Sequence, residues 1–184
     1  MLPPGHIAAG YLAAEITLRT FHFNLTPQET QHLIWLGTFF AFMPDLDFFV
    51  AFAKVRKLRI DNDKANHRRL ITHAPFVWLV ISIVFFVALS TDFGRAASTL
   101  LLVGTWAHFI LDSEWGITWY WPFSDHLKPF SAEFYRKKYA ESHPPKSLDF
   151  WKYWSKLAWD YYRKPQAWIE IILVIIAIIS LIKH

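Results

Sequence analysis

The chain is organised around one short stretch, Met43-Pro44-Asp45-Leu46-Asp47-Phe48. This stretch places two carboxylates inside residues 33–53, a run that is otherwise almost wholly apolar and approaches the thickness of a bilayer if it is helical. An ionised carboxylate far from water is unfavourable by several kcal/mol unless it meets a cation or several hydrogen-bond donors. An Asp pair at that depth therefore predicts a functional site, and the candidate cation is a metal ion.

The composition predicts a membrane protein. Of 184 residues, 54% are hydrophobic and only 18% are charged, against roughly a quarter charged in a typical soluble domain. The chain has no cysteine, so a metal would be held by His, Asp and Glu, a donor set that suits zinc or a harder divalent ion. The net charge of +4 comes mainly from loops between apolar runs, which reports membrane orientation. We therefore expect no nucleic-acid partner.

Five apolar runs are each expected to be helical, because irregular backbone cannot face lipid. They are residues 7–18, 33–53, 74–91, 96–111 and 167–182. The predicted fold class is all-α, a polytopic membrane bundle of about five helices that forms a single domain over residues 1–184. Thr26 and Glu29 have the spacing of a capping box and predict where the second helix begins.

The region 126–165, before a C-terminal membrane helix at 166–183, contains a further helical pattern. Phe150, Trp154, Leu157 and Tyr161 recur at helical spacing beside basic residues, which predicts an interfacial helix with its aromatic rings at headgroup level. The alternative is an ordinary packed helix in a cytoplasmic cap.

Seven candidate metal ligands fall toward the same ends of the predicted helices. They are His6, Asp45, Asp47, His67, His73, His108 and Asp112. The basic loop 54–69 and the basic region 113–166 lie on that side, which the positive-inside rule makes cytoplasmic, while the turn at 90–95 faces outward. Because the candidates were chosen by residue type alone, their convergence supports one metal site at the cytoplasmic face.

Local spacing refines this set. His108 and Asp112 are four apart, so they share a helical face and can hold one metal or act as ligand and supporting partner. Asp45 and Asp47 are two apart and would point to opposite sides of a regular helix. Joint ligation requires a backbone break, which Pro44 favours; alternatively the two carboxylates serve different metals.

Other interpretations of these residues stay open. Asp45 and Asp47 could neutralise Arg68 or Arg69 in a buried ion pair. Arg68 could bind a substrate phosphate or merely mark the cytoplasmic side. The remaining histidines lack such partners in the sequence and are expected at the surface. They are His22, His32, His126 and His143.

A set of motifs over residues 1–125, in consistent order, resembles the bacterial inner-membrane metal-dependent hydrolase family (YdjM-like). The motifs are His6 with Gly10, Pro44-Asp45-Leu46-Asp47, His67-Arg68 with Thr72-His73, His108 to Asp112, Gly116, and Trp121-Pro122-Phe123. The resemblance implies a location in the inner membrane and, through a distant similarity to the zinc phospholipases C, a hydrolase with a multinuclear site. A second His-x-x-x-acid pair, which those enzymes use, is missing here, so we expect one or two zinc ions instead of three.

The expected activity is metal-dependent hydrolysis by activated water, with one of Asp45 and Asp47 taking a proton while the other holds metal. A site at headgroup depth, with Arg68 close by, favours a phosphoester substrate such as a phospholipid or a related small molecule. Amide or carboxylic ester hydrolysis is a second possibility. A non-catalytic membrane protein with a structural metal or ion-pair site is the competing class, and a transporter would need polar residues along its path that the outer halves of the helices lack.

Overall fold

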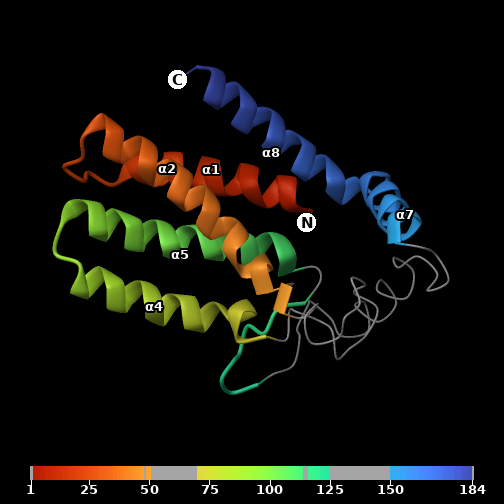
Figure 1. The fold of residues 1–184 in the computed structure, drawn as a ribbon, viewed down its shortest axis with the longest axis horizontal. Coiled ribbons are helices and arrows are strands. Elements are labelled where there is room, and N and C mark those ends of the chain that lie inside the picture. The colour runs from red at the N-terminus through yellow and green to blue at the C-terminus, as the bar shows by residue number, and fades with distance from the viewer. Residues whose placement is uncertain (1, 48, 51–69, 114–115, 125–149, 184) are drawn as a thin grey trace.

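The computed structural model describes residues 2–47, 49–50, 70–113, 116–124 and 150–183, and these residues are helical in the main (Figure 1). Its elements are α1 (Pro3–Thr20), α2 (Pro27–Phe42), the 3₁₀ helices η1 (Met43–Leu46) and η4 (Ile71–His73), α4 (Pro75–Ala88), α5 (Asp92–Asp112), α7 (Phe150–Tyr162) and α8 (Pro165–Ile182). The all-α prediction is confirmed for the described residues. Each of the five predicted apolar runs contains a helix, and α7 is a sixth.

Local signals explain where the helices begin. Pro3, Pro27, Pro75 and Pro165 stand in the first turn of α1, α2, α4 and α8, where a missing backbone N–H costs nothing. The predicted capping box is present at α2. The Thr26 hydroxyl accepts from the backbone N–H of Glu29, and the Glu29 carboxylate accepts from the backbone N–H of Thr26. These helix starts therefore follow from a few residues each.

Close packing of α1, α2 and α5 forms the centre of the bundle, with α4 against α5 and α8 against α1 (Figure 1). A Cβ atom on Gly10 would lie 2.5 Å from the Cβ of Ala41, and one on Gly104 would lie 2.9 Å from the carbonyl oxygen of Gly37. Only glycine allows these helix backbones to approach so closely. Both contacts lie toward the end of α2 that carries the Asp pair, so they bring α1 and α5 against it.

The predicted break in the second helix is confirmed. α2 ends at Phe42, and the chain continues as the 3₁₀ helix η1, which has Pro44 in its first turn. Proline cannot donate the backbone hydrogen bond that would continue the α-helix. The tighter winding changes the directions of Asp45 and Asp47 from those in a regular α-helix.

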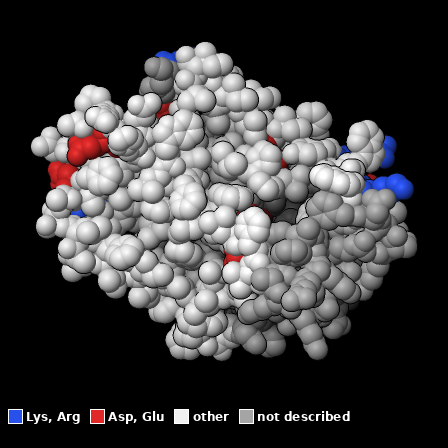
Figure 2. Space-filling model, viewed as in Figure 1, with Lys and Arg blue, Asp and Glu red and all other residues white. Residues whose placement is uncertain are grey.

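The observed helices α2 and α4 are shorter than the apolar runs of the sequence from which we predicted membrane-spanning helices. α4 has 14 residues, a length of about 21 Å, because the predicted run 74–91 includes the turn whose Thr91 caps α5. No single helix in the described residues is long and apolar enough to cross a bilayer, but Trp151–Tyr162 and Ala167–Ile182 satisfy that criterion as a pair bent by 88°. Among the described atoms on the face shown in Figure 2, uncharged ones predominate; the larger charged groups lie toward the edges, and a few acidic atoms are visible between them.

The predicted helix at residues 150–162 is confirmed with the same bounds, although its rotation differs from the prediction. Tyr161 of the predicted outward face is buried, and so is Tyr153. Trp151 and Trp159 point outward instead, with 77% and 63% of their surface exposed. The side chain of Phe150 lies outside the described residues.

Candidate metal centre

The predicted ligands that the structure describes converge at one end of the bundle. His6 lies in the first turn of α1, Asp45 in η1, His73 at the end of η4, and His108 and Asp112 in the last turns of α5. His6, His73, His108 and Asp112 have no exposed surface. His67 and Arg68 lie outside the described residues, so their predicted roles as ligand and substrate-binding residue stay predictions.

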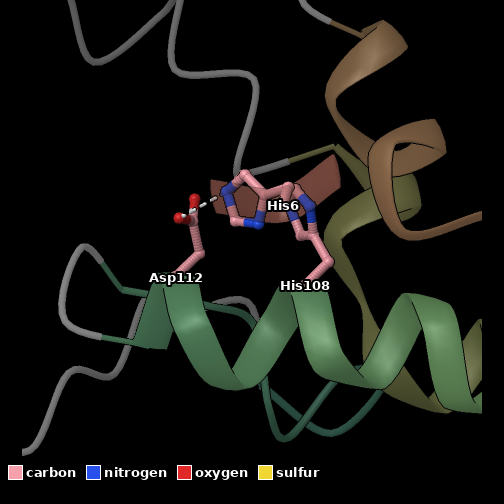
Figure 3. Close-up of side chains that lie close together, drawn as sticks. All are labelled: His6, His108 and Asp112. Carbon is pink, nitrogen blue, oxygen red and sulfur yellow. Dashed lines mark ion pairs between the residues drawn. The ribbon is translucent and has the colours of Figure 1, made fainter. Parts of the chain in front are cut away.

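One possible ligand set is His6, His108 and Asp112, shown in Figure 3. The rings of His6 and His108 stack with their centroids 4.1 Å apart, and His6 Nε2 lies 3.2 Å from Asp112 Oδ1. The helical spacing predicted that His108 and Asp112 share a face of α5, and the structure confirms it. All three side chains are fully buried, so this set is closed to solvent.

A second possible set is Asp45, His73 and His108. Asp45 Oδ1 lies 3.8 Å from His73 Nε2 and 3.7 Å from His108 Nε2. Donor atoms of one tetrahedral zinc site, each about 2.0–2.1 Å from the ion, lie roughly 3.3 Å apart, so these separations fit one ion with small adjustments. The Asp45 side chain is 19% exposed, and this set therefore has a route to solvent that the first one lacks.

The ring orientation of His108 suits a metal ligand. Its Nδ1 lies 2.9 Å from the carbonyl oxygen of Ala41, in the last turn of α2, where carbonyls lack partners within the helix. A hydrogen bond donated by Nδ1 leaves the lone pair on Nε2, which has no hydrogen-bond partner among the described residues. Nε2 has a single lone pair, so His108 can bind one ion at a time although it belongs to both sets.

Asp47 lies behind His73 and is not in either set. Asp47 Oδ2 is 2.8 Å from His73 Nδ1, the ring nitrogen away from Asp45, and it also accepts a hydrogen bond from the hydroxyl of Thr72. We predicted Asp47 as a ligand or proton acceptor. Its position is that of the carboxylate that commonly orients a metal-binding histidine and makes it more basic.

Supporting residues around His73 were not identified as such from the sequence. The indole N–H of Trp78 donates to the carbonyl oxygen of Thr72, and the hydroxyl of Thr118 donates to that of His73. Gly116, just before Thr118, has φ of 90°, a conformation that favours glycine. Thr72 and Gly116 belong to the motifs found in the sequence, so these two residues were the only indication there that the segments around His73 and Thr118 support the site.

The electrostatics of the cluster favour a cation. Asp45 and Asp112 bring two carboxylates to an almost dry site, and His6, whose Nε2 faces Asp112, has its other ring nitrogen, Nδ1, buried without a hydrogen bond to any described residue. Buried polar atoms are nearly always paired, so such a group indicates a missing partner such as an ion or water. The histidines predicted at the surface behave differently: His22 and His32 are exposed, and His126 and His143 lie outside the described residues.

Taken together, the fold and the site define an all-α bundle with a buried His–Asp cluster at one end of its helices. The family model of the YdjM inner membrane protein matches residues 1–184, so the chain belongs to the YdjM inner membrane protein family. The match extends past residues 1–125, which carry the recognised motifs. Membership supports the predicted membrane location, whereas the description of the family names no reaction.

No match was found among curated proteins or among solved structures. The distant similarity to the zinc phospholipases C stays an expectation that the family resemblance implies.

Proposed function

We propose that this chain is a membrane-bound metal-dependent hydrolase whose ion is held at the His–Asp cluster. The observation that carries the proposal is the pair of three-residue ligand sets that meet at His108. Nitrogen and carboxylate donors without thiolate suit zinc. The bound ion would supply an activated water at neutral pH and a positive charge for the developing oxyanion.

The second set is the better candidate for the reactive ion. His73 and His108 each have their Nδ1 held, by Asp47 and by the Ala41 carbonyl oxygen, so both present Nε2 toward Asp45. A catalytic site keeps a coordination position for water, and the partly exposed Asp45 is where solvent can enter. In this assignment Asp45 is a ligand, and Asp47 is a positioning residue instead of the proton acceptor.

A phosphoester of a phospholipid-like molecule is the proposed substrate class. The cluster residues lie in the first turn of α1, in η1 and η4, and in the last turns of α5, so the cluster is at one end of these helices, which corresponds to headgroup depth for a membrane-embedded protein. Charged phosphate groups occur at that depth, and an ion in the site would attract them. Amides and carboxylic esters are the alternative substrates for the same chemistry.

A structural metal site is the second candidate function, and the first ligand set favours it. His6, His108 and Asp112 are fully buried, and a closed coordination sphere is typical of ions that tie helices together. An ion held there would link α1 to α5 and would have no catalytic role.

Metal analysis of the full chain, purified in detergent, distinguishes these functions. We expect at least one divalent ion per chain, lost in His108→Ala because both sets need that residue, and retained in the control His32→Ala. Asp45→Asn should lose the ion of a catalytic second set, whereas His6→Ala should lose the ion of a structural first set.

Hydrolysis of a generic phosphodiester, then of individual phospholipids, should disappear with the metal and return when zinc is restored. Metal retained in His108→Ala would refute the site. Metal present without hydrolysis of any phosphoester, ester or amide would leave the structural function.

A further inference from the structure

The outward face of α7 has a mainly aromatic side and a basic side. At about 100° per residue, Trp151, Ser155, Trp159 and Tyr162 fall within roughly 80° of the helix circumference, and all four are exposed. The next roughly 40° carries only basic side chains, which are also exposed. They are Lys152, Lys156 and Arg163. An aromatic edge beside a basic edge is the arrangement of a helix that lies in a lipid headgroup layer.

The side-chain contacts on α7 are compatible with a location in a lipid headgroup layer. The guanidinium of Arg163 lies 5.4 Å from the ring centroid of Trp159, close enough for a cation–π interaction. Lys156 pairs with Asp160 at 3.3 Å, and Asp160 is the only acidic residue between 150 and 164. Basic residues therefore outnumber acidic ones over residues 150–164, a balance that complements anionic headgroups.

α7 is anchored to the rest of the protein through two adjacent tyrosines, Tyr161 on its buried face and Tyr162 on its outward face. The hydroxyl groups of Tyr161 and Tyr162 donate to the two carboxylate oxygens of Glu170 in α8, at 2.7 and 2.9 Å. The backbone N–H of Leu2, directly before α1, donates to the same carboxylate at 3.1 Å. Since His6 lies in the first turn of α1, these bonds hold α7 at the metal end of the bundle.

The direction of α8 sets α7 in the plane of a membrane. α8 carries no charge from residue 171 to 182, and its length of about 27 Å is close to the roughly 30 Å of a hydrocarbon core. Its exposed isoleucines are Ile169, Ile172, Ile175, Ile176, Ile178, Ile179 and Ile182. If α8 lies along the bilayer normal, α7, bent from it by 88°, lies parallel to the bilayer surface.

We propose that the outward face of α7 binds the anionic headgroup layer of the leaflet that faces the His–Asp cluster. Trp151 and Trp159 set the depth of the helix, and Lys152 and Arg163 select negatively charged phospholipids. This surface holds the metal end of the bundle at headgroup level. The proposal needs the membrane location of the family but does not depend on hydrolase activity.

A single-cysteine experiment tests it, because the natural chain has no cysteine. Ser155→Cys places a fluorescent label between Trp151 and Trp159, and His22→Cys places a matched label in the exposed loop at the other end of α1. The labelled full chain is reconstituted in phosphatidylcholine vesicles with or without phosphatidylglycerol. Quenchers are attached to lipids at headgroup depth, attached deep in the acyl chains, or dissolved in water as iodide.

We expect the label at residue 155 to be quenched best by the headgroup-level lipids, more strongly with phosphatidylglycerol present, and the label at residue 22 to be quenched best by iodide. Reversing two charges, with K152E and R163E, should abolish the effect of phosphatidylglycerol. R95E, which changes an exposed arginine at the opposite end, should preserve it.

Quenching of the residue 155 label by iodide alone would overturn the proposal, because the face would then be in water. Disulfide formation between two Ser155→Cys chains would overturn it in favour of a second copy. A phosphatidylglycerol effect that survives the double charge reversal would refute the basic edge as the lipid-selective element. Metal content should be unchanged in all these variants, so failure here is distinguishable from failure of the proposed function.

Discussion

Asp47 Oδ2 lies 2.8 Å from Nδ1 of His73, on the ring edge opposite the Nε2 that faces Asp45. Asp45 of η1 and Asp47, directly after η1, thus lie on opposite sides of one imidazole. A hydrogen bond to Nδ1 fixes the tautomer and makes Nε2 a better ligand. The two carboxylates therefore occupy different positions relative to His73, Asp45 near Nε2 and Asp47 at Nδ1, a difference that the sequence did not reveal.

Asp47→Ala should weaken metal binding by roughly 10- to 100-fold, the usual effect of losing a carboxylate behind a metal-binding histidine. Asp47→Asn should weaken it less, because the amide oxygen can still accept from Nδ1. Titration of the metal-free protein with zinc measures both. Asp92→Asn, at the far end of α5, is the control. A loss as complete as that of His73→Ala would instead make Asp47 a ligand.

Gly104→Ala should destabilise the protein by about 1–3 kcal/mol, although alanine favours helices, because the new methyl group has no space. Its Cβ would lie 2.9 Å from the Gly37 carbonyl oxygen and 3.1 Å from the Ala41 nitrogen, both backbone atoms. Separating α5 from α2 would also stretch the bond from His108 to Ala41, so zinc affinity should fall as well. Thermal unfolding in detergent, with Thr99→Ala as the control, measures the first effect. An unchanged unfolding temperature would contradict the close approach.

Glu170→Leu should destabilise the protein more than Glu170→Gln, because glutamine keeps an acceptor for the buried hydroxyl group of Tyr161 and the partly buried one of Tyr162. We expect faster proteolysis between α7 and α8 in the leucine variant. Glu15→Gln, which alters a second buried acid in α1, is the comparison. Equal protection of the wild type and both Glu170 variants would show that α7 is held by other contacts.

Thr26→Ala should cost about 1 kcal/mol of stability, and Thr26→Ser should cost little, because serine can also cap α2. The measurement is the free energy of unfolding at neutral pH. If the alanine variant is as stable as the serine variant, the cap contributes nothing.

The same cap predicts a dependence on pH. The backbone N–H of Thr26 donates to the Glu29 carboxylate at 2.8 Å and, with the hydroxyl of Thr26, lowers the pKa of Glu29 from its usual 4.5. A lowered pKa in the folded state means that ionised Glu29 stabilises the fold above the unfolded pKa, and that this contribution is lost as the pH falls through the folded pKa. The stability difference between the wild type and Glu29→Gln should therefore shrink in acid.

The orientation of the chain is testable with the same cysteines. The basic loops predict that the metal end is cytoplasmic, so Ser155→Cys should resist an impermeant thiol reagent in intact cells and react after lysis. His22→Cys, at the opposite end, should react before lysis. The reverse pattern would place the His–Asp cluster outside the cytoplasm.

Local features of this protein were readable from the sequence because a few neighbouring residues determine them. Thr26 with Glu29 marks the start of α2, Pro44 stops it, and the spacing of aromatic residues predicts α7 with its observed bounds. The apolar runs determined the all-α class, since helices satisfy their own backbone hydrogen bonds. Residue type and helix ends were also enough to gather His6, Asp45, His73, His108 and Asp112 as candidates.

Only the tertiary structure decided how these residues are grouped in space. The assignment of His108 to both ligand sets depends on how closely Gly104 lets α5 approach α2, and the placement of Asp47 depends on the path of the Thr72–His73 turn. The rotation that buries Tyr161 of α7 matches its hydrogen bond to Glu170 in α8, a carboxylate that also accepts from the backbone N–H of Leu2. Each of these contacts joins residues from different elements of the chain, and helical periodicity fixes which residues share a face without fixing which way that face turns.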